Sequence, residues 1–278
     1  MFRRGLEGCS PSFGLHSSLP KHSKSKSPCS YLILKGCRPC LSPQRTPCPR
    51  VRHFTPSSPL EMLLPSPQRI VLNTLEHMKH DKWGFVIYRC TYQDDDAWDL
   101  FKQTVFENTR KEMQASDAPQ LADKLEWTFV EDRTALDGAS RDELRKRFNQ
   151  WAAQAYPTEQ PRAQAQSQAA PTFGIPRYNY FIQVDEEALQ SVLAAPKNDP
   201  SGIGFVNFVD ARWTPMGDRY SNNEDDRFDS IDGCTEENVG WMRIATMMID
   251  TEWYDAAFNF AGGGWYVYYL RPPKVVLY

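Results

Sequence analysis

The sequence lacks histidine over most of its length. All five histidines precede residue 81: His16, His22, His53, His77 and His80. Serine and cysteine nucleophiles usually depend on an imidazole that moves a proton near neutral pH. Zinc hydrolases, zinc deaminases and histidine-ligated haem proteins need the same ring as a metal ligand. The chain beyond residue 80 lacks the ring that these chemistries use, so we lean away from an enzyme and predict no catalytic residue.

Signatures of phosphate binding and of membrane insertion are also missing. The sequence contains no G-x-x-x-x-G-K-[ST] motif and no G-x-G-x-x-G motif ahead of a helix. The G-G-G-W run at 262–265 lacks the lysine and the hydroxyl group of a phosphate-binding loop. No apolar run approaches the roughly 20 residues that span a bilayer. We therefore expect no cofactor and no association with a membrane.

Candidate metal ligands are few and poorly spaced. Cys37 and Cys40 form one C-x-x-C motif between Cys29 and Cys48, whereas a zinc ribbon needs two such motifs. The acidic runs at 94–96 and 224–226 offer oxygen ligands for Mg²⁺ or Ca²⁺, but the spacing of an EF-hand is absent. We interpret these runs as a helix start and a solvated loop, and we expect no metal ion.

The first seventy residues differ in composition from the rest of the chain. They contain none of the eight tryptophans, eleven of the 21 prolines and a net charge of +9, against −12 for the remainder. Because proline at this density interrupts helices and strands, we predict a disordered basic Pro/Ser/Cys-rich tail over 1–77 and a single domain over 78–278. Three origins of the tail stay open: upstream sequence with the true start at Met62 or Met78, a genuine disordered tail, or a transit peptide.

Cysteine usage points to a reducing compartment. Five of the seven cysteines lie in the tail, so the domain keeps only Cys90 and Cys234. Two cysteines in a domain of this length do not form a disulfide framework. We therefore expect a cytoplasmic protein.

The domain consists of alternating strand and helix patterns. Runs of β-branched and aromatic residues predict strands at 82–92, 124–132, 177–184 and 202–213. Helices are predicted from Asp94, with Trp98 and Phe101 as core anchors, from the capping box Ser140–Glu143 to about residue 155, and from 185. A low-complexity linker is expected at 157–174 and an acidic loop at 214–238. The segment 239–249 fits either a strand or a helix, and prolines 272 and 273 would break any late strand.

Two stretches of the domain resemble each other. A strand, an acidic helix start, a helix and a second strand occur twice, and the second strands read F-V-E-D-R (129–133) and F-V-D-A-R (208–212). Two tandem βαβ halves are typical of a ferredoxin-like sandwich, in which four antiparallel strands have helices on one face. We therefore predict an α+β fold of this type, with the helix at 140–155 as an insertion and an aromatic C-terminal extension. In this fold the strands at 83–92 and 177–184 lie side by side at the centre of the sheet, flanked by those at 125–132 and 203–210. An approximate two-fold axis relates the halves and places Arg133 and Arg212 at opposite ends.

Several segments carry a family resemblance. They are W-G-F-V-I-Y-R-C-T-Y (83–92), A-L-D-G-A-S (135–140), P-R-Y-N-Y-F-I-Q-V-D-E-E-A-L (176–189), G-F-V-N-F-V-D-A-R-W (204–213) and D-G-C-T-E-E-N-V-G-W-M (232–242). With these segments the chain resembles a large family of uncharacterised filamentous-fungal proteins. The likeness covers nearly all of the domain and none of the tail, which favours a late start codon. That family has no established activity, so the resemblance assigns no functional residue.

Four residues are candidates for a binding site. Tyr88 and Arg89 lie in the first strand, which is apolar on both faces and must be covered on both. Arg133 and Arg212 end the two matched strands and could form an anion site, although such residues more often pair at the surface with a nearby aspartate, here Asp132 and Asp210. Cys90 follows Arg89, but adjacent strand residues point to opposite faces, so we expect a packed, inert thiol.

These patterns favour a non-catalytic binding or interaction module. The alternative is a histidine-free enzyme or small-molecule binder of the dimeric α+β-barrel type. Its first candidate site residues are Tyr88, Arg89 and Arg212. Either reading allows a homodimer through an open face of the sheet. Nucleic-acid binding is disfavoured because phosphate contacts need lysine and arginine, whereas the domain is acidic.

Overall fold

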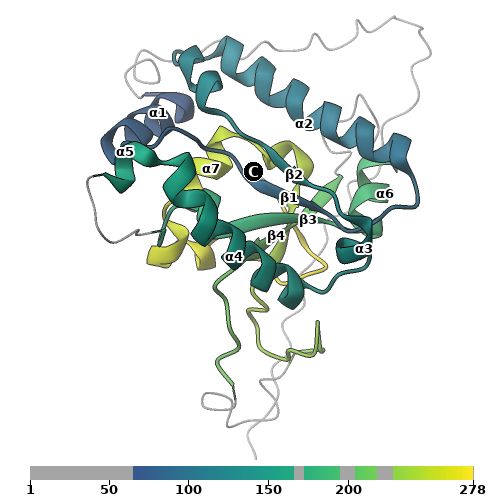
Figure 1. Ribbon diagram of the computed structural model, residues 1–278. Coiled ribbons are helices and arrows are strands. Elements are labelled where there is room, and N and C mark those ends of the chain that lie inside the picture. Colours follow the sequence, from purple (N-terminus) through teal and green to yellow (C-terminus); the bar gives the residue numbers. More distant parts are fainter. Residues whose placement is uncertain (1–64, 166–171, 195–203, 218–227, 278) are drawn as a thin grey trace, which may run out of the picture. The chain divides into compact units, whose positions relative to one another are not determined.

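A six-stranded mixed sheet is the centre of the computed structural model, which describes residues 65–165, 172–194, 204–217 and 228–277 (Figure 1). The strands, in the order in which they lie in the sheet, are β2 (Thr128–Val130), β1 (Val86–Arg89), β3 (Tyr180–Val184), β4 (Phe205–Asp210), β5 (Trp241–Ala245) and β6 (Val275–Val276). β1 is parallel to β2 and β3, β4 is antiparallel to β3 and β5, and β6 is parallel to β5. The four predicted strands are all present, and the ambiguous segment forms β5.

The strand order agrees with the sequence-based expectation, but the strand directions do not. β1 and β3 lie side by side and are flanked by β2 and β4, as predicted. A ferredoxin-like sandwich requires antiparallel neighbours, whereas β1 is parallel to β3. In addition, the first half joins parallel strands β1 and β2, and the second half joins antiparallel strands β3 and β4. The halves are therefore not related by a two-fold axis, and the structure does not confirm the ferredoxin-like sandwich.

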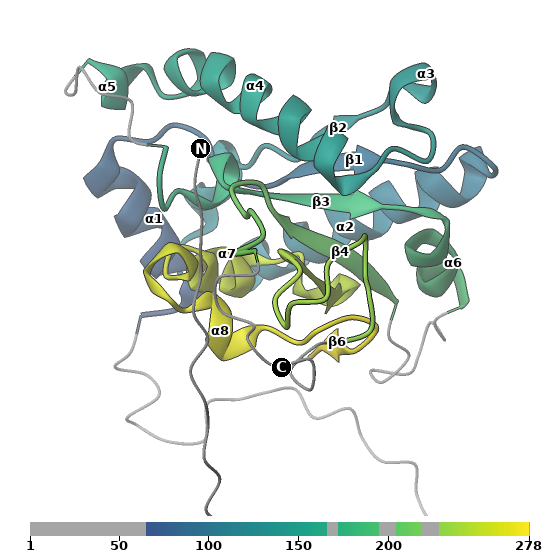
Figure 2. The ribbon, with the colours of Figure 1, turned by 90° about the horizontal axis from the view of Figure 1, so that it is seen from below.

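Helices cover the sheet on both faces. On one face, α2 (Asp95–Ala115), α6 (Glu186–Ala194) and α7 (Thr251–Ala257) contribute to one hydrophobic cluster, and on the other face α4 (Arg141–Glu159) contributes to a second (Figure 2). Every residue of β1 and of β3 is buried. The open face through which we expected a homodimer is therefore covered by α4 of the same chain.

The helix predicted as an insertion is a crossover connection. The chain passes from β1 through α2 to the edge strand β2, and then returns over β1 through α4 to reach β3. Because βαβ crossovers are right-handed, two crossovers that run in opposite directions lie on opposite faces of the sheet. Helix α4 is thus an integral layer of the fold.

The predicted helix starts are confirmed. Asp94 accepts a hydrogen bond from the Ala97 backbone N–H at the start of α2, and the Ser140–Glu143 capping box is present at the start of α4. Trp98 and Phe101 are fully buried, as core anchors should be. Helix α4 ends later than expected, at Glu159, and α5 (Pro161–Gln164) follows, so the predicted linker is shorter. Residues 166–171 and 218–227 lie outside the described segments.

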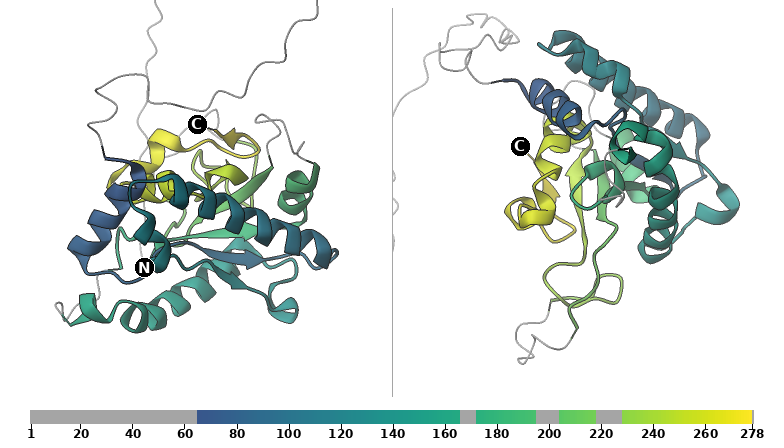
Figure 3. Two further views of the ribbon diagram at one scale, coloured as in Figure 1. Left: turned by 90° about the horizontal axis from the view of Figure 1, so that it is seen from above. Right: turned by 60° about the vertical axis from the view of Figure 1, so that its left-hand side comes forward.

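The predicted tail boundary is wrong by about one helix. Residues Pro67–Met78 form α1, because the Ser66 hydroxyl caps the Arg69 N–H at 3.1 Å and Pro67 occupies the first turn, where its missing N–H costs nothing. Val71, Leu72 and Leu75 are buried in the same cluster as α7, beside which α1 lies (Figure 3). The folded part of the chain therefore begins before residue 78, and residues 1–64 are not described.

The aromatic C-terminal extension packs on the α2 face of the sheet. Trp265 stacks on Tyr180 and Phe208 of the sheet, and Trp253 packs edge-to-face on Phe208. The short elements of the fold are η2 (Pro119–Lys124), α3 (Arg133–Leu136), η3 (Pro176–Tyr178), η5 (Thr246–Met248), η6 (Phe260–Gly262) and α8 (Trp265–Tyr268). None of the helices in the described segments is long and apolar enough to cross a bilayer.

Candidate functional site

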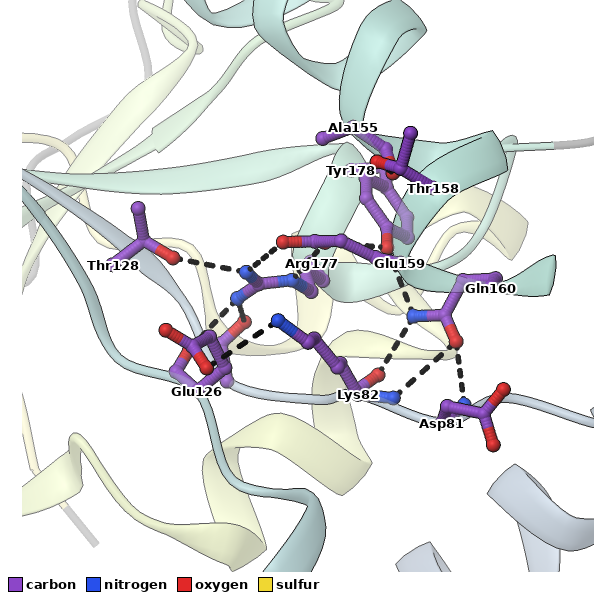
Figure 4. Close-up of polar contacts among 11 residues, drawn as sticks. Asp81, Lys82, Glu126, Thr128, Ala155, Thr158, Glu159, Gln160, Arg177 and Tyr178 are labelled. Atoms are coloured by element: carbon purple, nitrogen blue, oxygen red, sulfur yellow. Dashed lines mark hydrogen bonds and ion pairs between the residues drawn. The ribbon is translucent and has the colours of Figure 1, made fainter.

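Two polar clusters lie at opposite ends of β1 and β3. The first surrounds Arg177, whose side chain is fully buried before the start of β3 (Figure 4). Its guanidinium group donates to both Glu159 carboxylate oxygens at 2.8 Å, to the Thr128 hydroxyl at 2.9 Å, and to the backbone carbonyls of Gly84 and Glu126 at 3.2 and 2.7 Å. These five bonds use the full donor capacity of the group, so the cluster has no donor left for a ligand.

The partners of Arg177 are equally occupied. Tyr178 donates its hydroxyl proton to Glu159 at 2.8 Å, and Gln160 donates to the Tyr178 oxygen at 2.9 Å. Burial acts to raise the pKa of Glu159, but the hydrogen bonds and charge of Arg177 outweigh it and hold that pKa below its usual value. We interpret this first cluster as structural, because it ties the end of α4 to the starts of β1 and β3.

The second cluster is a polar row at the other end of the parallel strands. Tyr88, Gln183, Asn207 and Arg243 are neighbours across β1, β3, β4 and β5. Gln183 and Asn207 are buried, but their amides meet at only 3.5 Å, and Asn207 Oδ1 has no hydrogen-bond partner among the described residues. Unlike the first cluster, this one is not fully satisfied.

A cavity of about 410 Å³, here called the inner pocket, adjoins this row. It is lined by Cys90, Gly138, Ala139, Ser140, Arg141, Asp142, Gln183, Asp185 and Asp232. Cys90 and Asp185 directly follow β1 and β3, and Ser140 caps α4. The pocket thus lies outside the carboxyl ends of two parallel strands, at the point where the strand order reverses. Open α/β sheets bind ligands at such a point.

Arg141 joins three segments at the wall of the inner pocket. Its guanidinium group donates to the Asp232 carboxylate at 2.9 and 3.2 Å and lies 3.5 Å from Asp185. The same group lies over the Trp241 ring, 3.6 Å from its centroid. A cation over an indole face is attracted by the ring quadrupole, so this position both pairs the charge and withdraws it from solvent.

Asp232 reaches Arg141 from the tip of a short hairpin. Ile231 and Cys234 pair with each other, and Asp232 and Gly233 between them have positive φ values of 50° and 81°. Positive φ at both central positions is the geometry of a type I′ turn, for which Asp-Gly is a preferred sequence. Turn chemistry therefore explains the unusual backbone of Asp232 and presents its carboxylate to the pocket.

Two further hollows adjoin the inner pocket along α4. One, of about 460 Å³, lies under the hairpin, and the other is a shallow groove that includes Lys146, Asn149 and Arg212. Trp213 lines both hollows and lies so close to Gly240 that a Cβ atom there would come within 2.3 Å of the indole. Arg145, which also lines both, donates at 3.0 Å to each of two backbone carbonyls, those of Asp210 and Gly240. Arg145 therefore ties the end of β4 and the residue before β5 to α4, and Trp213 packs on that same residue, Gly240.

Cys90 lies in the inner pocket as a neutral thiol. Burial raises its pKa to about 12, and the hydrogen bond from Gln183 offsets only part of this effect. Because the thiolate is the nucleophilic form, a thiol with this pKa is unreactive near neutral pH. The packed, inert thiol predicted from the sequence is consistent with this position.

The four predicted binding residues do not form one site. Tyr88 is buried against Phe181, and burial raises the pKa of its hydroxyl group. Arg89 donates to the Thr91 carbonyl at 2.8 Å, pairs with Asp95 and Glu131, and lies over the Tyr92 ring. Neither residue lines the inner pocket, and the Arg89 side chain lies on the α2 face of the sheet, over the Trp98 ring.

Arg133 and Arg212 lie far apart in the fold. Arg133 is exposed at the end of β2 and approaches the same Tyr92 ring as Arg89. Arg212 follows β4, which runs opposite to β1, and donates to the Thr172 hydroxyl at 2.6 Å. The two arginines are therefore at opposite ends of the sheet, as expected from the sequence, and do not create a joint anion site.

Metal-binding geometry is absent from the described segments. No group of three or more His, Cys, Asp or Glu side chains there is arranged to hold a metal ion. Asp94 of the first acidic run caps α2, whereas the second run at 224–226 and the tail cysteines lie outside the described residues.

The sequence-based reasoning missed Arg141, Gln183, Asn207 and Asp232. A signal for two of them was present, since Gln183 and Asn207 interrupt the otherwise apolar runs Y-F-I-Q-V and F-V-N-F-V. A polar residue inside a strand buried on both faces needs a partner, and therefore indicates a buried polar site. The D-G pair at 232–233, inside the predicted acidic loop, is a sequence typical of a hairpin turn.

The chain was compared with protein-family models, with curated proteins and with solved structures, and no significant match was found in any of the three.

Proposed function

We propose that this protein is a non-catalytic binding module that holds a small polar molecule in the inner pocket. The observation that carries the proposal is the place of the pocket outside the carboxyl ends of β1 and β3, at the strand-order reversal. Its volume of about 410 Å³ falls within the range of small-molecule sites. The unsatisfied amide of Asn207 beside it supports the same interpretation.

The chemistry of the lining favours binding over catalysis. Cys90 is held as a thiol by burial, and the phenol pKa of neighbouring Tyr88 is raised, so neither group is poised to exchange a proton near neutral pH. The candidate residues of the enzyme alternative were Tyr88, Arg89 and Arg212. Arg212 lies at the end of the sheet opposite to Tyr88 and Arg89, so the three do not form one site. A cytoplasmic location and the likeness to the filamentous-fungal family belong to this proposal on the evidence of the sequence alone.

The proposal is tested by narrowing the pocket. Ala139 is half-buried in the lining, so Ala139→Leu reduces the cavity without a change of charge. We expect at least one class in a panel of small amines, polyols, amino acids and carboxylic acids to raise the Tm of the full chain, and Ala139→Leu to remove that shift. Ala122→Leu, at an exposed site in η2, is the matched control. A panel without any stabilising compound, or a shift that survives in Ala139→Leu, contradicts the proposal.

A further inference from the structure

The charges of the inner pocket are unbalanced. Three carboxylates line it, those of Asp142, Asp185 and Asp232. Arg145 pairs with Asp142 at 2.7 Å, and Arg141 must serve both Asp185 and Asp232. One negative charge is therefore left in excess in a partly enclosed site, where charges are screened less than at an open surface.

The charged atoms that a ligand can reach are mainly acidic. The side chains of Asp142, Asp185 and Asp232 are 76, 31 and 50 % exposed, whereas that of Arg141 is 14 % exposed. The guanidinium group is drawn back against Trp241, and its two terminal nitrogens already face carboxylates. A molecule entering the pocket therefore meets hydrogen-bond acceptors with negative charge.

Behind Asp185, the buried amide of Asn207 has an oxygen atom to which no group donates a hydrogen bond among the described residues. Asn207 Nδ2 donates to Asp185 at 2.8 Å, which fixes the orientation of the amide and leaves Oδ1 as a buried acceptor without a partner among the described residues. This acceptor lies on the same amide group that contacts the pocket lining. A buried acceptor of this kind calls for a donor, just as the carboxylates do.

We propose that the inner pocket recognises a small organic cation, a primary ammonium or guanidinium compound, through Asp185 and Asp232. This inference rests on the binding function proposed above and adds the chemical class of the ligand. A single positive charge would balance the site, and its N–H groups would donate to the exposed carboxylate oxygens.

Other ligand classes fit less well. An anion would face three carboxylates, and the N-terminus of α4 cannot compensate because Ser140 and Glu143 already cap it. A bare metal ion lacks a suitable set of ligands in the described segments. A neutral polyol would find acceptors but would leave the excess charge unbalanced.

The test uses three probes of similar shape: n-butylammonium, n-butanol and butyrate. The apparent Kd of each for the full chain is obtained from the rise in Tm with probe concentration. We expect binding of n-butylammonium alone, and weaker binding at about 0.5 M salt, where the screening length falls to a few Å.

Asp232→Asn is the decisive variant. Asn-Gly is as suitable as Asp-Gly for a type I′ turn, so the hairpin keeps its geometry while the pocket loses the excess charge. We expect n-butylammonium to bind this variant roughly tenfold more weakly or worse, as for loss of one partner in a partly buried charge pair. Asp123→Asn, at an exposed site in η2, changes the net charge equally and should leave the Kd unchanged.

The outcomes separate this inference from the proposed function. If n-butanol, butyrate or another compound of the panel without a positive charge binds and Ala139→Leu abolishes that binding, while n-butylammonium does not bind, the pocket is a binding site but the cation inference is wrong. If n-butylammonium binds equally well to Asp232→Asn and to the wild type, the inference is also wrong. If no compound binds in an Ala139-dependent manner, both proposals fail.

Discussion

At the scale of single residues, His80 shows how burial creates a dependence on pH. His80 is 2 % exposed, packs edge-to-face on Tyr156, and its Nδ1 has no hydrogen-bond partner among the described residues. Burial lowers its pKa from 6.5 to about 4, although the nearby Asp81 carboxylate acts to raise it. The folded chain therefore keeps this ring neutral in a range where the unfolded chain protonates it.

This difference predicts a loss of stability in mild acid. Between pH 6.5 and 4 the unfolded state binds one more proton at His80 than the folded state, so the free energy of unfolding falls as the pH falls. The expected loss reaches about 3 kcal/mol near pH 4, at 1.36 kcal/mol per pKa unit. Urea unfolding at a series of pH values should show a smaller slope for His80→Gln than for the wild type. His77→Gln, at an exposed site of α1, should keep the wild-type slope, and equal slopes for all three proteins would refute the assignment.

Replacing Arg177 should lower the free energy of unfolding for a different reason, the loss of a buried ion pair. Because its guanidinium group satisfies five acceptors in a buried site, Arg177→Met leaves the Glu159 carboxylate without its partner. Removing one member of a buried ion pair typically costs about 3–5 kcal/mol. Arg162→Met is the control: Arg162 pairs with Asp81 while half exposed, so its replacement should lower the free energy of unfolding far less than Arg177→Met does. Similar free energies of unfolding for the two variants would show that the Arg177 cluster is not structural.

At the scale of elements, α1 corrects the predicted start of the folded chain. Proline density hid this helix, although Ser66-Pro67 is a favourable helix start and Val71, Leu72 and Leu75 have helical spacing. Composition averaged over 70 residues does not reveal a 12-residue helix at the end of that stretch. Composition locates a boundary less accurately than capping and periodicity do.

The helix should be needed for folding. A chain that begins at residue 79 loses three buried aliphatic side chains, which together correspond to roughly 5–9 kcal/mol of apolar burial, comparable with the stability of a whole domain. We expect no cooperative thermal transition for 79–278 and a normal transition for 65–278. Within the intact helix, Leu75→Ala should lower the Tm clearly more than Ile70→Ala, because Leu75 is fully buried and Ile70 is 36 % exposed. A cooperative transition for 79–278 close to that of 65–278 would contradict this expectation.

At the scale of the whole molecule, the sequence predicted the elements well and their connections only in part. Alternation of apolar residues, Asp94 and the Ser140–Glu143 capping box located strands and helix starts, because these signals are local. Strand direction is not a local property. It depends on which face each crossover covers, and no short-range pattern distinguished α4 as a crossover from α4 as an insertion.

The candidate site was hidden for the same reason. Cys90, Arg141, Gln183 and Asp232 come from four segments that meet only when α4 crosses the sheet and the hairpin folds back. Of the four residues that the sequence did suggest, three are arginines at the ends of strands. One of them, Arg89, already contacts the Thr91 carbonyl and the carboxylates of Asp95 and Glu131. The type of a residue indicates which chemistry it could perform. Which residues come together in one site depends on the topology of the fold.

The position of Arg141 over Trp241 gives the molecule an internal optical reporter. The indole has a cation 3.6 Å from its ring centroid, and both carboxylates that hold this cation line the inner pocket. Indole emission responds to the local electric field. Any event that draws Asp185 or Asp232 away from the guanidinium group would move a charge relative to the Trp241 ring and alter its fluorescence. Binding of a ligand in the pocket would therefore change the fluorescence emission of Trp241, a side chain that is itself buried.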